Sequence, residues 1–238
     1  MGKNQDTTID RPITVDDHRT LNNAQLKKGQ TAVNDALKFP TAEDFERDLT
    51  DLLNGDYEEK GESITIALTD LDNFYHINGD FGREEGDRIL IETGKYLKSA
   101  LPEYARIYRI GGDEFSIIFN SPLEREEIFL LLNEIKNGYD VKTPDGVKQT
   151  MTIGMSTAGV DASRYPELVR KADSALYRAK ISGRNKVAMA KEEKMIPKTS
   201  HFTQEQLQRL SLLAKQEGIG EAILLREALD LLLKKYDV

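Results

Sequence analysis

Cysteine and tryptophan are absent from the sequence, and histidine is scarce. Without cysteine, the chain can form neither a disulfide framework nor a cysteine-based zinc site. This absence fits a reducing compartment, and we expect a cytoplasmic protein. The three histidines, His18, His76 and His201, lie far apart in the sequence, which argues against a histidine metal cluster. Any metal ion would therefore need oxygen ligands.

Long apolar runs and an excess of positive charge are also missing. No apolar stretch approaches the roughly 20 residues that span a bilayer. Residues 1–17 lack the apolar segment of a signal peptide, and we expect no membrane partner. The formal net charge is −8, which is unlike a general nucleic-acid binder. A chain of this charge that handles phosphate groups would need metal ions or a local cluster of cationic side chains.

The apolar content, 39% of 238 residues, suffices for one core and a small appendage. Residues 1–38 are polar, and we expect them to form a separate N-terminal segment with little order or a loose helix. Residues 39–189 mix strand and helix periodicities without strict alternation, which favours an α+β domain with a largely antiparallel sheet flanked by helices. Strands are predicted at 62–72, 106–110 and 115–119, a hairpin at 139–157, and helices after Thr41 and at 87–101, 125–138 and 166–183.

Residues 190–200 change character because they are charged, contain Pro197 and show no clear period. We assign them to a linker or short strand. Residues 201–238 form a second, smaller module. In it, helices are predicted at 204–217 and 221–235, separated by "EGIG".

Acidic residues gather at the predicted ends of strands. Asp70 and Asp72 are two residues apart, so their side chains share one face of a strand. The stretch "YRIGGDEFSIIF" (108–119) places Asp113 and Glu114 in a turn between two other strands. Carboxylates brought close together repel one another unless a cation lies between them, and oxygen-only ligands suit Mg²⁺ or Mn²⁺. The glycines allow a tight turn and the close approach of a bulky nucleotide.

Two simpler interpretations compete with this metal site. The Gly-Gly-Asp-Glu turn is also compatible with an ordinary hairpin. The stretch "DLDNFYHINGDF" (70–81) has spaced acids like a calcium loop, but Phe74 and Tyr75 stand where an EF-hand has Asp or Asn and then Gly. The calcium interpretation therefore fails, and the hairpin stays open on these residues alone.

Four segments together resemble the GGDEF, or diguanylate cyclase, family. The first is "GGDEF" preceded by Arg109, and the second, residues 70–87, is similar to the family pattern D-x-D-x-F-K-x-I-N-D-x-x-G-H-x-x-G-D. "TMTIGMS" resembles the family's late strand, and "ADSALYRAKISGRNKV" resembles its final helix and loop. The resemblance covers residues 41–187 and implies the palm-type, nucleotidyl-cyclase-like fold of that family.

The resemblance implies a reaction and the residues that perform it. Two GTP molecules would be condensed into cyclic di-GMP with release of pyrophosphate, in a homodimer that brings two half-sites face to face. The implied ligands of Mg²⁺ or Mn²⁺ are Asp70, the carbonyl of Leu71, and Asp113. The implied catalytic residues, which would activate the ribose 3′-hydroxyl, are Asp113 and Glu114. The implied substrate-binding residues are Asn78 and Asp87 for guanine, Phe74, and the basic pair Lys180 and Arg184 for phosphate.

Ordinary structural roles compete with these assignments. Asp72 could support only a loop, and Asn78 before Gly79 is a good turn dipeptide. Lys180 and Arg184 are four residues apart, which predicts one side of a helix end, and they could form a solvated helix face.

The sequence also departs from the family pattern. Three positions lack the family's usual Lys, Asp and His and hold instead Tyr75, Gly79 and Arg83. The family's N-terminal signature is reduced to Asp35 and Leu37. Pro102 and Ala105 replace the Arg-x-x-Asp motif of product inhibition, so feedback through that site is not expected.

Residues 202–236 resemble a ribbon-helix-helix domain. Thr203 and Gln206 form a capping-box pattern, and the apolar stripes of both helices are too large for one small copy to bury. We therefore expect pairing with a second copy. In that family the strand before the first helix enters the DNA major groove. From Lys191 onward the chain has eight Lys/Arg and eight Asp/Glu, and DNA affinity depends on phosphate neutralisation. Dimerisation alone and dimerisation with DNA binding both stay open.

Three functions fit these observations. The first is a magnesium-dependent diguanylate cyclase that works as a dimer. The second is a DNA-binding regulator whose GGDEF domain binds GTP or cyclic di-GMP with little or no turnover, and the departures at Tyr75, Gly79 and Arg83 keep it open. The third, a cyclase of a different dinucleotide, is disfavoured by Asp87, because an Asp accepts hydrogen bonds from the ring N–H and amine of guanine.

Overall fold

The computed structural model describes residues 32–192, 197–217 and 220–235. The chain forms two compact units that divide between Lys191 and Glu192, and each unit is described by itself. Within the described ranges, no helix is both long and apolar enough to cross a membrane. Most of the segment predicted at 1–38 lies outside these ranges. Its described end, residues 32–37, is helical and buries Val33 and Leu37 in the core of the first unit.

The first unit is built on a five-stranded sheet with the order β2-β3-β1-β4-β5. The strands are β1 (Ser63–Leu71), β2 (Ala105–Arg109), β3 (Glu114–Ser121), β4 (Met151–Thr157) and β5 (Val187–Met189). β1 pairs antiparallel with β3 and β4, β2 pairs antiparallel with β3, and β5 runs parallel to β4. The α+β fold with an antiparallel-rich sheet is therefore confirmed.

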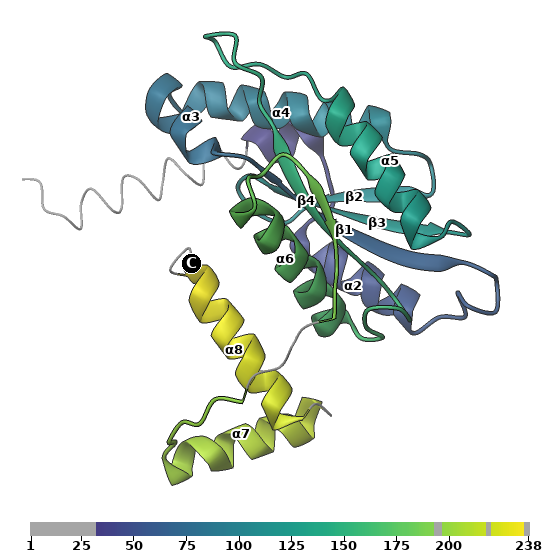
Figure 1. Ribbon diagram of the computed structural model, residues 1–238, viewed down its shortest axis with the longest axis vertical. Helices are drawn as coiled ribbons and strands as arrows, with labels where there is room; N and C mark the ends of the chain where they lie inside the picture. Colours follow the sequence, from purple (N-terminus) through teal and green to yellow (C-terminus); the bar gives the residue numbers. More distant parts are fainter. Residues whose placement is uncertain (1–31, 193–196, 218–219, 236–238) are drawn as a thin grey trace, which may run out of the picture. The chain divides into compact units, whose positions relative to one another are not determined.

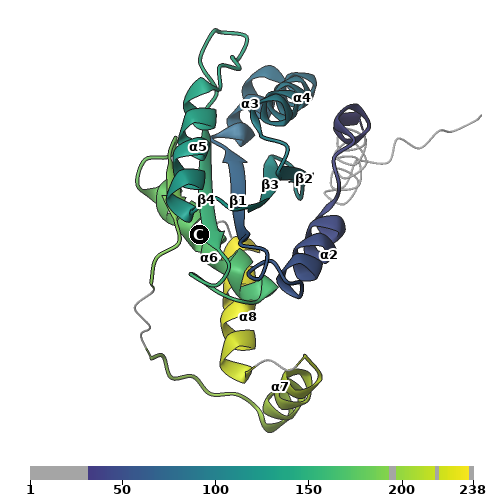
Figure 2. The ribbon, with the colours of Figure 1, turned by 90° about the vertical axis from the view of Figure 1, so that its right-hand side faces the viewer.

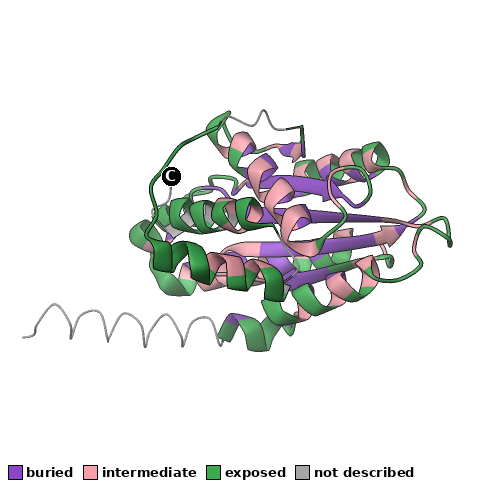
Figure 3. Cartoon of the chain, turned by 90° about the horizontal axis from the view of Figure 1, so that it is seen from below, coloured by how far each residue is buried: buried purple, intermediate pink, exposed green. Residues whose placement is uncertain are grey.

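Helices cover both faces of this sheet (Figures 1 and 2). One face packs against α2 (Ala42–Leu53) and α6 (Tyr165–Ile181), and the other against α3 (Phe74–Phe81), α4 (Arg83–Ala100) and α5 (Arg125–Gly138). Successive side chains of a strand point to opposite faces. Along β1, Ile66 and Leu68 therefore join the core under α2 and α6, whereas Ala67 and Leu71 join the other core. Figure 3 shows the resulting buried sheet between helices with exposed outer faces.

A glycine lets α6 rest directly on the sheet. A Cβ atom at Gly154 of β4 would lie 2.2 Å from the carbonyl oxygen of Ala172 and 2.3 Å from the amide nitrogen of Leu176. Only a residue without a side chain allows backbone and backbone to approach so closely. This contact fixes α6 over the central strands of the sheet.

Two elements of the first unit, α3 and β5, were not predicted from the sequence. A third, the hairpin at 139–157, is less regular than predicted. The helix α3 follows Asn73, which has a φ of 57° and makes no side-chain hydrogen bond to cap the helix. The sequence therefore has no capping pattern that predicts this helix. The strand β5 is only three residues long. In the expected hairpin at 139–157 the turn forms, but its first arm is reduced to one bridge, Lys142 to Lys148. The cause is that β4 already has β1 and β5 on its two edges.

The second unit contains α7 (Gln204–Glu217) and α8 (Glu221–Lys235), which agree with the predicted helices. Its capping box forms as expected: the Thr203 amide donates to Gln206 Oε1 over 2.9 Å, and the Gln206 amide donates to Thr203 Oγ1 over 3.2 Å. Residues 197–203 have no regular secondary structure, and 193–196 lie outside the described residues. The ribbon strand stays a prediction, because its hydrogen bonds would come from a second copy.

Candidate active site

The ends of β1 and β3 bring acidic side chains together. Asp70 is the Cα partner of Glu114 in the antiparallel pair, and the Leu71 amide donates to the carbonyl of Asp113 over 3.4 Å. The register of this pair is set by apolar residues that must face the two cores. Asp70 and Asp113, more than forty positions apart in the sequence, therefore lie near one another at the same end of two neighbouring strands.

Lys180 joins this acidic cluster from the last turn of α6. Its Nζ lies 2.8 Å from Oδ2 of Asp70. Asp70 is 8% exposed, and burial raises the pKa of its carboxyl to about 6, although Lys180 opposes the rise and Asp113 adds to it. Burial also raises the pKa of Asp113, with a smaller rise from Glu114. The site thus holds more buried negative charge than Lys180 neutralises.

The acidic cluster does not form a complete metal cage by itself. In the part of the chain that the structure describes, no three acidic or histidine side chains are placed to hold a metal ion, and Asp70 faces Lys180 instead. Mg²⁺ is usually held by one or two carboxylates together with waters and substrate phosphates. Asp70, Asp113 and the Leu71 carbonyl supply such an oxygen set beside uncompensated negative charge. These residues therefore fit a divalent cation that arrives with a triphosphate.

Arg109 is a site residue whose role the sequence reasoning missed. It is 9% exposed at the end of β2, its Nη2 donates to the carbonyl of Gly112 over 2.8 Å, and its Nη1 donates to the side-chain oxygen of Asn34. Burial lowers its pKa, while the charges of Asp87 and Asp113 oppose that change. The signal in the sequence was a cationic residue directly after the apolar pair Ile107 and Tyr108 and directly before the turn. Arg109 fixes the Gly-Gly-Asp-Glu turn to the helix at residues 32–37.

The residues proposed for guanine recognition lie where α3 meets α4. A Cβ atom at Gly86 would lie 2.1 Å from Oδ1 of Asn78 and 3.2 Å from Cζ of Phe74. Both side chains therefore pack against the residue that precedes Asp87. Burial raises the pKa of Asp87, partly offset by Arg109 and Arg83. Asp87 also borders a shallow, open depression along α4, whose lining does not include Asn78 or Phe74. Phe74 is buried in the core, so its side chain also has a structural role.

The basic pair does not occupy one helix face as its spacing predicts. The helix α6 ends at Ile181, and the chain then turns through Gly183 with a φ of 108° and Arg184 with a φ of 58°. Arg184 therefore lies beyond the helix and is exposed, whereas Lys180 faces Asp70. The glycine allowed the left-handed turn that ended the helix.

Asp72 binds its surroundings rather than pointing freely into the site. Its Oδ1 accepts a hydrogen bond from the Thr152 hydroxyl over 2.6 Å. Its Oδ2 accepts from the Thr150 hydroxyl over 2.7 Å and from the Asn185 amide over 3.0 Å. The structure therefore favours a structural role for Asp72, in which it supports a loop.

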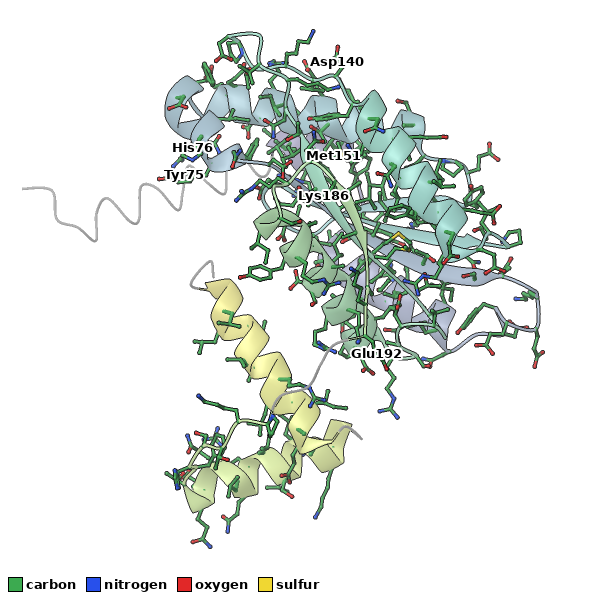
Figure 4. The ribbon with its side chains drawn as sticks, viewed as in Figure 1. Tyr75, His76, Asp140, Met151, Lys186 and Glu192 are labelled. Carbon is green, nitrogen blue, oxygen red and sulfur yellow. The ribbon has the colours of Figure 1, made fainter. Side chains whose placement is uncertain are left out.

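Tyr75 stands where the family commonly has Lys, and its side chain is 83% exposed. Figure 4 shows it beside His76 at the start of α3, with ring centroids 5.8 Å apart. The replacement removes a positive charge from this surface and disturbs no buried contact.

Comparisons with known proteins agree with this geometry. A family model described as "Diguanylate cyclase, GGDEF domain" matches residues 37–186, and one described as "Ribbon-helix-helix domain" matches residues 195–237. Diguanylate cyclase A of Treponema denticola is 33% identical over 137 residues, which cover 56% of this chain and 37% of that protein. The probable diguanylate cyclase DgcC of Escherichia coli is 30% identical over 128 residues, which cover 53% and 34%. The chain thus matches little more than a third of the length of these relatives.

A solved structure shows the same architecture. The GGDEF domain of YfiN (also called TpbB) from Pseudomonas aeruginosa superposes with a TM-score of 0.62 at 26% identity, covering 66% of this chain and 99% of that domain. The five-stranded sheet, the acidic turn and the family match over residues 37–186 all indicate a GGDEF domain. Residues 195–237 are similar to ribbon-helix-helix domains, and the chain belongs to the GGDEF-domain diguanylate cyclase family.

Proposed function

We propose that the protein condenses two GTP molecules into cyclic di-GMP and pyrophosphate, as a homodimer that depends on Mg²⁺ or Mn²⁺. The observation that carries this proposal is the partly buried acidic cluster at the ends of β1 and β3, which combines Asp70 and Asp113 with Lys180. Nucleotidyl transfer needs charge neutralisation at the α-phosphate and a group that takes the proton of the attacking hydroxyl. The cluster offers residues for both tasks.

The roles follow from the surroundings of each residue. Asp70, the Leu71 carbonyl and Asp113 would hold the divalent cation, which supplies charge neutralisation at the reacting phosphate when it is bound. Asp113, assisted by Glu114, would accept the proton of the ribose 3′-hydroxyl. Burial raises the pKa of Asp113, and this makes its carboxylate a better proton acceptor at neutral pH. Lys180 would exchange part of its contact with Asp70 for the triphosphate.

Substrate recognition would come from the α3–α4 junction and the end of α6. Asp87 and Asn78 would accept and donate hydrogen bonds at the guanine edge, and Phe74 would hold the backbone that approaches the nucleotide. Lys180 and Arg184 would bind phosphate oxygens. Each GGDEF domain would then present one GTP.

Ring closure requires two such sites face to face, so two chains must pair. The ribbon-helix-helix unit supports this part of the proposal because it exposes large apolar side chains in the single chain, including Leu212, Leu229 and Leu231, the last being 64% exposed. A small unit gains stability by burying such a surface against a second copy. Pairing through the tail would raise the effective concentration of half-sites.

The test is an incubation of the purified full chain with GTP, with ATP, and with both, in the presence of Mg²⁺, followed by chromatography of the products. We expect cyclic di-GMP from GTP alone, and its loss when a chelator removes the metal. A dinucleotide that contains adenine would contradict the assigned specificity. GTP binding without any product would contradict the cyclase and support the second candidate, a regulator without turnover.

That second candidate is favoured by one specific observation, the ribbon-helix-helix match at residues 195–237. A paired tail would place two strands for contact with a DNA major groove. The measurement is binding to mixed duplex DNA at several salt concentrations, since phosphate contacts weaken steeply with salt. Salt-dependent binding would support a DNA-bound cyclase or regulator, and no binding at low salt would leave the tail with dimerisation only.

A further inference from the structure

The loop after α6 has an unfavourable backbone conformation that the surrounding structure must hold in place. Arg184 and Asn185 have φ angles of 58° and 48°, and left-handed conformations are disfavoured for residues with a side chain. The loop begins where α6 ends and leads into β5. In Figure 4, Lys186 marks its end, next to Met151 of β4. A loop of this kind keeps one shape only where specific contacts outweigh its strain.

Asp72 provides the central contact. Its carboxylate accepts the Asn185 amide over 3.0 Å, and the same amide also lies 3.0 Å from Oγ1 of Thr152. The hydroxyls of Thr150 and Thr152 donate to the two oxygens of Asp72. Asp72 is 4% exposed, and a carboxylate buried to this extent is stable only when it is fully hydrogen-bonded. The carboxylate therefore links β1, β4 and the loop in one network.

This network fixes the backbone on both sides of Arg184 and thereby the direction in which its side chain leaves the loop. Its own amide donates to the carbonyl of Ala179 over 3.0 Å, and the next amide along the chain is held by Asp72. Both peptide groups that flank Arg184 are thus fixed, while its side chain is exposed. The preceding helix turn carries Lys180, which faces Asp70.

We propose that Asp72 is a positioning residue for phosphate binding: its carboxylate holds the left-handed loop and thereby directs Arg184 at the phosphates of the nucleotide. The inference rests on the proposed function, in which Arg184 contacts phosphate. Both oxygens of Asp72 accept hydrogen bonds from Thr150, Thr152 and Asn185, so its role would be exerted through the loop. Asp72→Asn replaces one carboxylate oxygen by an N–H₂ group and removes the negative charge, so it weakens the network with little change in shape.

The chain supplies a matched control at the opposite end of β4. Asp161 is also a largely buried carboxylate that accepts a main-chain amide, from Thr157 over 2.8 Å, and it lies 3.3 Å from a guanidinium nitrogen of Arg125. It holds a loop that carries none of the proposed site residues. Asp161→Asn therefore tests the loss of a buried carboxylate without any effect on Arg184.

The experiment measures amide hydrogen exchange across residues 182–186 of the full-length protein together with its GTP kinetics. For Asp72→Asn we expect faster exchange in this loop and a rise in KM for GTP of about tenfold with kcat nearly unchanged. A merely structural loss would lower the active fraction and thus kcat, leaving KM as it was. Asp161→Asn should leave loop exchange and KM at the parent values.

A double-mutant cycle links the effect to Arg184. In an Arg184→Ala background, Asp72→Asn should raise KM no further, because the group that it directs is gone. Equal increases in both backgrounds would overturn the proposal, and so would unchanged loop exchange in Asp72→Asn. If Asp72→Asn does not fold, Thr152→Val takes its place with the same expectations, since it removes a donor to Asp72 and an acceptor for the Asn185 amide.

A pyrophosphate-binding measurement separates this proposal from the proposed reaction. Inorganic pyrophosphate needs neither a guanine pocket nor turnover. If the protein makes no dinucleotide but loses pyrophosphate affinity in both Asp72→Asn and Arg184→Ala, the positioning role stands and the cyclase reaction fails. If the parent protein does not bind pyrophosphate, the positioning role is overturned.

Discussion

At the scale of single residues, the acidic cluster depends on charges that are kept close together against their mutual repulsion. Asp70 and Asp113 are both buried enough for their pKa values to rise, and Lys180 compensates only part of the charge. A site that holds excess negative charge in a partly buried environment favours the binding of a cation. Under the proposed function, Lys180 would release part of its contact with Asp70 when a cation and a triphosphate bind.

Removing one carboxylate from this cluster should stop the chemistry and spare the fold. We expect Asp113→Asn to lower the rate of dinucleotide formation by at least about 100-fold, because a preorganised electrostatic partner is lost. The measurement is product formation from GTP under saturating Mg²⁺, with thermal unfolding recorded in parallel. Asp51→Asn, at an exposed position of α2, is the control and should behave as the parent. Turnover near the parent rate in Asp113→Asn would refute the assignment.

At the scale of elements, the position of α6 depends on Gly154. The backbone of α6 lies so close to β4 that a Cβ atom would overlap with main-chain atoms of Ala172 and Leu176. Main-chain atoms cannot rotate away as a flexible side chain can. The helix that carries Lys180 therefore has one permitted distance from the sheet.

Gly154→Ala should destabilise the first unit by roughly 1–3 kcal/mol, the usual cost of overpacking. The change should appear as a lower midpoint of urea unfolding with a similar slope. Gly79→Ala is the matched substitution, because nothing lies within 4 Å of a Cβ atom at that position. Equal midpoints for both variants would show that α6 can move away from β4.

A second connection between elements joins the helix at residues 32–37 to the Gly-Gly-Asp-Glu turn. Arg109 donates to Asn34 on one side and to the Gly112 carbonyl on the other, and its amide donates to the Pro40 carbonyl over 2.9 Å. Displacement of that helix would thus be transmitted to the turn that carries Asp113. The short helix is part of the machinery that shapes the site.

Asn34→Ala should loosen this turn and lower dinucleotide formation by roughly tenfold, since small misplacements of reacting groups are costly. Steady-state rates with GTP provide the measurement. Asn54→Ala, at the exposed C-cap of α2, removes a similar side chain away from the turn and should leave the rate unchanged. Equal rates in both variants would show that Arg109 holds the turn without Asn34.

At the scale of the whole molecule, the chain consists of two units with different surfaces. The first unit carries the acidic cluster, and the second exposes apolar helix faces that one copy does not bury. A reaction that needs two half-sites gains from any part that keeps two chains together. Under the proposed function, the first unit would catalyse the reaction and the second would hold two chains together.

Removal of residues 192–238 should make specific activity rise steeply with protein concentration, because the half-sites then meet only by diffusion. The measurement is the initial rate of product formation over a wide range of concentrations. Attaching a parallel dimeric coiled coil in place of the tail should restore activity at low concentration. A truncated protein whose specific activity stays constant over that range would contradict the role of the tail.

The sequence by itself determined the fold class, the family and most of the proposed site. Apolar spacing and capping patterns are local properties, so α4, α5, α6 and both tail helices were predicted from them. The acids of the motif could be named for the same reason. Elements without a local signal, α3 and β5, could not be predicted.

Only the tertiary structure decided what each polar group touches. Asp72 and Asn185 are 113 residues apart in the sequence, and Arg109 and Asn34 are 75 apart. No local sequence pattern can therefore predict either contact. The spacing of Lys180 and Arg184 predicted one helix face, but the chain turned left-handed at Gly183 and separated them. Strand register and the close packing of α6 on Gly154 determine these neighbours, because they depend on how distant segments fill the same two cores.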